Sequence, residues 1–86
     1  MYYVYVLYSE RLGVHYIGYT SDIAKRMKRH NNGYERYTKK GVPWKLLCAK
    51  EVASRQEAMK LERQLKKLKS RVKLREWVNN VVGSEN

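Results

Sequence analysis

The sequence predicts a small α+β domain in which helices pack on a three-stranded, largely antiparallel sheet, in the order β-β-α-β-α-α. The chain has 86 residues, 43% of them hydrophobic, which suits one folded domain with a thin core. Three segments rich in aromatic and β-branched residues are separated by a turn and by helix-like segments with capping residues. The chain contains no internal repeat and no low-complexity segment, so a single domain accounts for all of it.

The expected strands are residues 2–8, 14–20 and 44–52. The first, YYVYVLY, consists only of aromatic, β-branched and leucine residues, which is typical of a strand buried on both faces. The turn SERLG follows it, so the first two strands predict a β-hairpin. Pairing Tyr5 opposite Tyr16 gives a loop of ordinary length and would set the two phenols side by side.

Three helices are expected. Ser21 and Asp22 offer N-cap oxygens to the segment IAKRMKRH. The sequence SRQE, which begins at Ser54, fits a capping box and predicts a helix that runs to about Lys69. Ser70 can cap a further short helix.

The expected domain spans residues 1–80 and is followed by a frayed tail, residues 81–86. Cys48 is the only cysteine, so neither an internal disulfide nor a cysteine metal site is expected. The chain shows no signal-peptide layout and no apolar stretch of transmembrane length. We therefore expect a cytoplasmic protein.

Charge is the strongest feature of the composition. Nineteen Lys and Arg residues against eight Asp and Glu residues give a net charge of +11. A polyanionic partner would relieve the self-repulsion of such a chain, and nucleic acid, DNA or structured RNA, is the first candidate. The basic, amphipathic stretch KLERQLKKLKSRVKLR also suits an anionic membrane surface. We rank a membrane last among the candidate partners and expect no membrane binding, because the apolar stripe of this stretch is needed for the core.

Two cations fall on the inward side of the first helix. At about 100° per residue, Arg26 and His30 share the stripe of Ile23 and Met27. An inward guanidinium costs desolvation free energy unless it meets an anion. Arg26 has two structural alternatives to a role in binding an anionic ligand: an internal salt bridge, or an aliphatic stem that lies on the core with its guanidinium in water. An inward histidine is often only a structural residue.

Glu62 stands on the flank of the apolar stripe of the long helix. Its structural alternative is an ion pair with Lys66, four residues later. The eight tyrosines, with no phenylalanine, also draw attention, because each buried phenol needs a hydrogen-bond partner. Gly18 shares a strand face with Tyr16 and would let the backbone of a ligand approach closely.

The tripeptides Tyr3-Val4-Tyr5 and Tyr16-Ile17-Gly18 carry a resemblance to a known family. With them, the chain resembles the GIY-YIG nuclease superfamily, specifically its small stand-alone bacterial members, from Tyr2 to about Trp77. The first tripeptide departs from the family motif, with Tyr and Val in place of Gly and Ile, but it keeps the tyrosine. Further matches at the family's usual spacing are Thr20, Arg26, His30, Asn31 and Glu62.

The resemblance implies metal-dependent hydrolysis of a nucleic-acid phosphodiester, with DNA favoured over RNA. Glu62 would hold one divalent cation, Mg²⁺ or Mn²⁺, and Arg26 would stabilise charge on the transferring phosphate. Tyr5 would activate the attacking water, while Tyr16 and His30 position groups and shuttle protons. The residues expected to contact substrate are Gly18, Thr20, Asn31 and, in the basic loop 34–43, Lys39 and Lys40.

The composition also fits a second function, a basic nucleic-acid-binding module with the same fold and no catalysis. The sequence leaves open the substrate structure, the choice between DNA and RNA, the pathway, the oligomeric state and any partner protein. It leaves open as well whether this stand-alone chain is catalytically active by itself.

Overall fold

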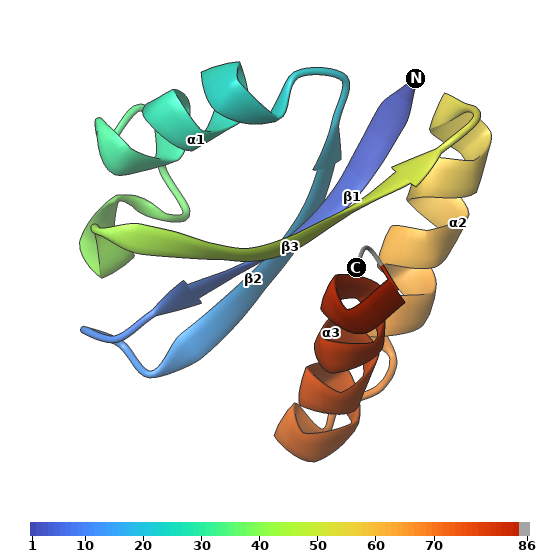
Figure 1. Cartoon of the computed structure of the whole chain (residues 1–86). Coiled ribbons are helices and arrows are strands. Elements are labelled where there is room, and N and C mark those ends of the chain that lie inside the picture. Colours follow the sequence, from blue (N-terminus) through green and yellow to red (C-terminus); the bar gives the residue numbers. More distant parts are fainter. Residues whose placement is uncertain (85–86) are drawn as a thin grey trace.

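The computed structural model describes residues 1–84 of the chain, and it confirms the predicted α+β fold class (Figure 1). Three antiparallel strands form one sheet in the order β2-β1-β3. In chain order the elements are β1 (Tyr2–Ser9), β2 (Val14–Thr20), α1 (Ile23–Asn31), the 3₁₀ helix η1 (Lys39–Gly41), β3 (Trp44–Val52), α2 (Arg55–Lys66) and α3 (Arg71–Ser84).

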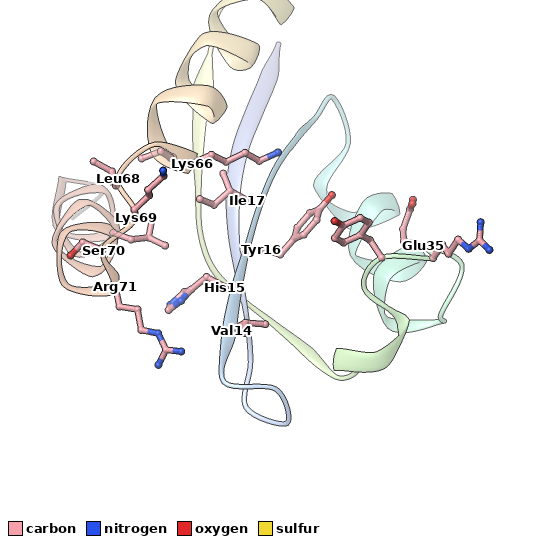
Figure 2. Close-up of a pocket in the computed structure, with 14 residues that line it drawn as sticks. Val14, His15, Tyr16, Ile17, Glu35, Lys66, Leu68, Lys69, Ser70 and Arg71 are labelled. Atoms are coloured by element: carbon pink, nitrogen blue, oxygen red, sulfur yellow. The ribbon is translucent and has the colours of Figure 1, made fainter.

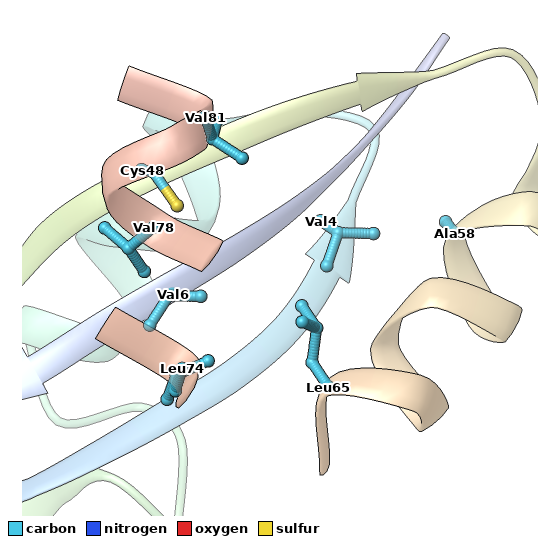
Figure 3. Close-up of a cluster of buried hydrophobic side chains, with 8 residues drawn as sticks. All are labelled: Val4, Val6, Cys48, Ala58, Leu65, Leu74, Val78 and Val81. Carbon is cyan, nitrogen blue, oxygen red and sulfur yellow. The ribbon is translucent and has the colours of Figure 1, made fainter. Parts of the chain in front are cut away.

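Helices cover both faces of the sheet, with α1 on one face and α2 and α3 on the other (Figure 1). The larger core lies between the sheet and α2 and α3. Figure 3 shows its buried members, which are Val4, Val6, Cys48, Ala58, Leu65, Leu74, Val78 and Val81. The smaller core, on the α1 face, contains Tyr5, Leu7 and Trp44, against which Ile23 and Met27 of α1 pack.

The central strand β1 is buried on both faces, as its composition predicts. Val4, Tyr5, Val6 and Leu7 are each no more than 2% exposed. Because side chains alternate along a strand, Val4 and Val6 point into the larger core while Tyr5 and Leu7 point into the smaller one. The position of Tyr5 is therefore determined by the packing of the whole sheet.

The predicted register of the hairpin is wrong. Tyr5 lies opposite Gly18, and Tyr16 lies opposite Leu7. The strands continue to the pair Ser9 and Val14, so the loop begins one residue later than expected. Gly13 closes this loop with a φ of 66° and an N–H that donates to the Ser9 carbonyl oxygen.

The helices begin where the capping residues predict. Asp22 accepts a hydrogen bond from the Lys25 N–H, and Ser54 accepts one from the Glu57 N–H. The helix α2 ends at Lys66 instead of continuing to about Lys69. The chain turns at Lys69, which has a φ of 50°.

The prediction of a frayed tail is wrong for residues 81–84. The helix α3 runs to Ser84, because Val81 packs into the larger core and is only 7% exposed. Residues 85–86 of the expected tail lie outside the described residues.

The leucines of the basic, amphipathic stretch belong to the core. Leu65 and Leu74 are buried, and Leu61 and Leu68 pack against the same cluster. Among residues 1–84, no helix has both the length and the apolar character that a membrane crossing requires.

We expect Val81→Asp to lower the free energy of unfolding by about 2–4 kcal/mol, because it places a carboxylate in the core without a partner. Val82→Asp is the matched control, since Val82 is 44% exposed in the same helix, and its effect should stay within about 0.5 kcal/mol. Urea unfolding followed by circular dichroism measures both. Equal stability of the two variants would contradict the position of α3.

Candidate active site

Four of the predicted reactive side chains, those of Tyr5, Tyr16, Arg26 and Glu62, line one open cavity of about 380 Å³. They come from β1, β2, α1 and α2, so four separate segments meet there. The remaining lining residues are Tyr2, Gly18, Tyr19, Thr20, Ser21 and Arg55. The tertiary structure thus brings together two phenols, a guanidinium and a carboxylate that lie far apart in the sequence.

The cavity lies across the edge strand β2. The side chain of Tyr16 lies on the α1 side of the sheet, the face that Gly18 shares, whereas the side chain of Tyr19 lies on the α2 side. All three residues line the cavity. This explains how Glu62, on a helix that covers the opposite face from Tyr5, can reach the same space. Its negative charge contributes to the elevated pKa of both Tyr5 and Tyr16.

Tyr5 begins a buried chain of hydrogen bonds. Its hydroxyl lies 3.0 Å from His30 Nε2, and His30 Nδ1 lies 2.8 Å from the Thr38 hydroxyl oxygen. The Thr38 hydroxyl in turn donates to the carbonyl oxygen of Glu35 at 3.5 Å. This direction assigns the proton of neutral His30 to Nδ1, so that Nε2 accepts from the Tyr5 hydroxyl.

Burial keeps both partners of the first bond neutral. It raises the pKa of the Tyr5 phenol well above its ordinary range; the neighbouring Tyr16 adds to the rise and Arg26 opposes it. Burial also lowers the pKa of His30 below its ordinary value of 6.5, while the charge of Glu35 opposes this and Arg26 and Arg29 add to it. Tyr5 therefore carries its proton at pH 7, next to an imidazole nitrogen that can accept one.

Tyr16 packs close to this pair. Its ring centroid lies 6.3 Å from that of Tyr5 and 5.0 Å from that of His30. Burial raises the pKa of the Tyr16 phenol, with the charge of Arg26 acting in the opposite direction. Tyr16 is thus also protonated at neutral pH, and its ring faces the cavity.

Gly18 has a different role from the one expected. A Cβ at this position would lie 2.6 Å from the Tyr5 hydroxyl oxygen and 2.8 Å from the adjacent ring carbon. The space left by the missing side chain is therefore filled by the phenol of Tyr5 and not kept for the backbone of a ligand. Glycine is required here because any side chain would displace Tyr5.

Arg26 reaches the cavity but is held by a carboxylate from the following loop. Its Nη1 lies 3.1 Å from Glu35 Oε1, and the same oxygen accepts from Arg29 Nε at 2.9 Å. Burial raises the pKa of Glu35, but the bonds and charges of Arg29 and Arg26 outweigh it, so the pKa lies below its ordinary value. The predicted structural alternative, an internal salt bridge, therefore exists together with exposure of Arg26 to the cavity.

Of the carboxylates in residues 1–84, only that of Glu62 lines the cavity, and its oxygen lies 3.4 Å from Lys66 Nζ. Within residues 1–84, no group of three or more His, Cys, Asp or Glu side chains could hold a metal ion. A cation at this cavity would thus have one protein oxygen ligand, with water and substrate oxygens completing its shell. That donor set suits a hard cation such as Mg²⁺ or Mn²⁺.

Two predicted site residues are part of the framework. His30 is fully buried and does not line the cavity, so it lies behind Tyr5 and not beside a substrate. The amide of Asn31 bonds the backbone of Trp44, accepting from its N–H at 2.7 Å and donating to its carbonyl oxygen at 3.3 Å. Asn31 thereby joins the end of α1 to the start of β3.

The other predicted substrate contacts lie apart from one another. Thr20 lines the cavity, and its hydroxyl oxygen accepts from the Asp22 N–H at 3.1 Å. Lys39 and Lys40 are exposed in η1, which follows the Thr38 segment, and neither of them lines this cavity.

The sequence prediction missed Glu35, Thr38 and Arg55. Glu35 had a usable signal, since it is the only acidic residue between Asp22 and Glu51 in a strongly basic stretch. Thr38 had none, because its contact with His30 depends on the path of the loop. Arg55 lines the cavity beside Tyr19, whose hydroxyl oxygen lies 3.5 Å from Arg55 Nε.

The chain is similar to known proteins over most of its length. A family model described as the GIY-YIG catalytic domain matches residues 1–75. The UPF0213 protein of Streptococcus pneumoniae serotype 4 is 46% identical over 68 residues, which cover 78% of this chain and 68% of that protein. The UPF0213 protein of Bacillus licheniformis is 45% identical over 74 residues, which cover 85% of this chain and 75% of that protein.

A solved structure is similar as well. The solution NMR structure of the UPF0213 protein from Bacillus halodurans has a TM-score of 0.58 and 37% sequence identity. The match covers 92% of this chain and 84% of that one. The names of these relatives state no activity.

We expect Gly18→Ala to destabilise the protein by about 1–3 kcal/mol, because the new Cβ collides with the Tyr5 phenol. Gly83→Ala is the matched control: nothing lies within 4 Å of its Cβ position in α3, and helix propensity should add about 0.5–1 kcal/mol of stability. Thermal unfolding of the two variants measures this. A stable Gly18→Ala protein with unchanged tyrosine absorbance would contradict the packing of Tyr5 on Gly18.

Proposed function

The chain belongs to the GIY-YIG catalytic-domain family, and on that basis we propose that it is a divalent-metal-dependent nuclease that hydrolyses nucleic-acid phosphodiesters, with DNA as the preferred substrate. One observation carries the proposal. Tyr5, Tyr16, Arg26 and Glu62 line the same open cavity, although they come from four elements. A cavity with a cation, a carboxylate and two phenols suits a phosphate and an attacking water far better than it suits an apolar ligand.

Tyr5 and His30 would remove the proton of the attacking water together. The water oxygen forms a bond to phosphorus as its proton moves to the Tyr5 hydroxyl oxygen, while the proton of Tyr5 passes to His30 Nε2. The bond from phosphorus to the leaving oxygen breaks, and solvent water protonates that oxygen. The proton on His30 then returns through the Tyr5 hydroxyl to the hydroxide that this leaves in solvent. This path needs no free phenolate, which the elevated pKa of Tyr5 makes scarce at pH 7.

Glu35 would support the same transfer. When His30 accepts the proton it becomes an imidazolium, and the negative charge of Glu35 favours that form. Thr38 holds the ring in place through Nδ1. The two residues thus orient the acceptor and lessen the cost of charging a buried ring.

Arg26 would stabilise the negative charge that grows on the phosphate oxygens in the transition state. A guanidinium in a partly buried cavity acts at lower dielectric than water, so its effect on the barrier is large. Its bond to Glu35 restricts the side chain before substrate arrives, which lowers the entropy lost on binding.

Glu62 would hold the divalent cation. To do so, its carboxylate would give up the ion pair with Lys66. The cation, Mg²⁺ or Mn²⁺, would polarise the phosphate and neutralise charge on it. Tyr16 would position the phosphate or the water through its hydroxyl. The lining residue Arg55 is a further cation for a substrate phosphate.

A second function, nucleic-acid binding without cleavage, is supported by the net charge of +11 and by the ion pair between Lys66 and Glu62. In that case the cavity would receive a phosphate without a metal. The two functions differ in one result, metal-dependent cleavage.

We expect purified protein to cleave DNA with Mg²⁺ or Mn²⁺, and Arg26→Ala to lower the rate about 100- to 1000-fold, because it removes charge stabilisation in the transition state. Glu62→Ala should remove metal-dependent cleavage. A panel of linear, flapped, branched and single-stranded substrates, resolved on gels, measures both effects.

The exposed residues Arg63 and Glu76 provide matched controls, since neither lines the cavity. Arg63→Ala and Glu76→Ala should cleave at rates close to that of the unchanged protein, and all variants should keep the same circular dichroism spectrum. Binding that survives in the unchanged protein without cleavage of any substrate by any metal would overturn the nuclease proposal in favour of the binding module.

We expect the cleavage rate to hold as the pH falls to 6.5 and to decline only at lower pH. Burial lowers the pKa of His30 below 6.5, so the ring stays neutral and able to accept a proton until the pH drops further. His30→Gln keeps a hydrogen-bonding side chain without a titrating group, and it should lower kcat about 100-fold and remove this acid limb. A pH–rate profile of both proteins measures the effect, and an unchanged acid limb in the variant would exclude His30 as the acceptor.

A further inference from the structure

Two of the eight tyrosines are exposed, and both lie in the segment 34–38 between α1 and η1. Tyr34 is 72% exposed and Tyr37 is 92% exposed, whereas the other six are buried or half-buried. A single exposed aromatic residue is ordinary on a protein surface. Here two occur three positions apart with the exposed Arg36 between them, a combination typical of surfaces on which nucleic-acid bases stack.

The segment that presents these rings is firmly anchored. Its backbone bonds run from the Tyr34 N–H to the Arg29 carbonyl oxygen and from the Thr38 N–H to the Glu35 carbonyl oxygen. The Thr38 carbonyl oxygen also accepts from Trp44 Nε1 at 2.7 Å. The rings are therefore held outside the core by a fixed backbone and not left there by a loose loop.

The same segment holds two groups of the candidate active site. Glu35 binds Arg26, and Thr38 binds His30. Tyr37 is two residues from Glu35 and one residue from Thr38. A ligand that contacts Tyr37 would thus bind beside both residues that support the catalytic side chains.

Tyr37 also forms part of the wall of a groove of about 920 Å³ (Figure 2). The floor of the groove is the outer strand β2, and the segment with Glu35 lies on the opposite side of that strand from the junction of α2 and α3 (Figure 2). Tyr16 lines both this groove and the catalytic cavity, so the two spaces lie next to each other at this residue.

The far wall of the groove combines three cations with three leucines, which are Leu65, Leu68 and Leu74. Lys66, Lys69 and Arg71 line it, and Figure 2 shows them facing the side chains of β2. On the floor, His15 Nε2 is buried and has no hydrogen-bond partner within residues 1–84. Buried polar atoms are normally bonded, so a ligand in the groove would satisfy this nitrogen.

From the two stacking rings, the three cations of the far wall and the junction at Tyr16, we infer that the groove binds an unpaired stretch of DNA that leads to the scissile phosphate. Bases would stack on Tyr37 and Tyr34, and phosphates would face Lys69 and Arg71. This inference deepens the proposed function, on which it rests, by naming the substrate as single-stranded or locally unpaired DNA.

An unpaired strand fits these features better than a duplex does. In a duplex the faces of the bases are covered by their neighbours, so an exposed tyrosine finds no base face to contact. A single strand offers both its base faces and its phosphates to opposite walls of one groove. Tyr37 on one wall and the three cations on the other match that division.

The test is binding without cleavage, by fluorescence anisotropy of the full chain with EDTA present. The probes are a labelled single-stranded oligonucleotide of about 20 nucleotides and a hairpin duplex of the same composition. We expect Tyr37→Ala to weaken single-strand binding about tenfold and to leave duplex binding unchanged, and Tyr37→Phe to restore binding to within about twofold. Tyr34→Ala should act in the same direction, whereas Val72→Ala, at a 67% exposed position of α3 outside the groove, should have no effect.

The inference is overturned if the unchanged protein does not bind the single strand, if Tyr37→Ala binds it as well as the unchanged protein, or if that variant loses duplex affinity to the same extent. These results are separable from the nuclease proposal. Tyr37-dependent binding without metal-dependent cleavage supports the groove and overturns the enzyme. Cleavage that requires Arg26 but is indifferent to Tyr37 and Tyr34 supports the enzyme and overturns the groove.

Discussion

A buried hydrogen bond, 3.0 Å from the Tyr5 hydroxyl to His30 Nε2, joins the central strand to helix α1, and the candidate active site is built around it. Tyr5 can reach His30 because β1 alternates its side chains between two cores and because Gly18 leaves room for the phenol. His30 in turn fixes Thr38, and so the segment that leads to η1. Removal of either partner would leave a buried polar group without a hydrogen bond, a cost comparable to that of a large core substitution.

The same burial gives the bond its chemistry. Desolvation disfavours charge on both groups, so the pKa of Tyr5 rises while that of His30 falls. The resulting pair is a neutral phenol that donates to a neutral imidazole, an arrangement in which a proton can move without a persistent phenolate. A contact that stabilises the fold is therefore also the proposed proton path, and it runs from Tyr5, which lines the cavity, to His30 behind it.

Carboxylates are scarce in this chain, and two of the eight acidic residues stand at the site. Glu35 binds Arg26 and Arg29, which restrains the guanidinium that faces the cavity. Among residues 1–84, Glu62 is the only acid that lines the cavity. Glu35 also lines the groove along β2, whose other lining residues are mainly cations, aromatic rings and aliphatic side chains. An excess of positive charge, with one carboxylate at the cavity and another that holds Arg26, is the electrostatic pattern that the proposed substrate requires.

The sequence alone determined the three strands, the three α-helices, their order and the inward stripe that carries Arg26, because strand alternation, helical periodicity and capping depend on residues within a few positions of one another. It also placed Glu62 beside the apolar stripe of its helix. Only the tertiary structure decided the hairpin register. It also decided that the Tyr5 phenol fills the space at Gly18, where room for a ligand was expected, and that His30 is buried behind Tyr5. The loop contacts of Glu35 and the groove beside β2 belong to the same group. All of these depend on which distant residues meet, and that is determined by how the strands pair and how the faces pack, not by the spacing of residues along the chain.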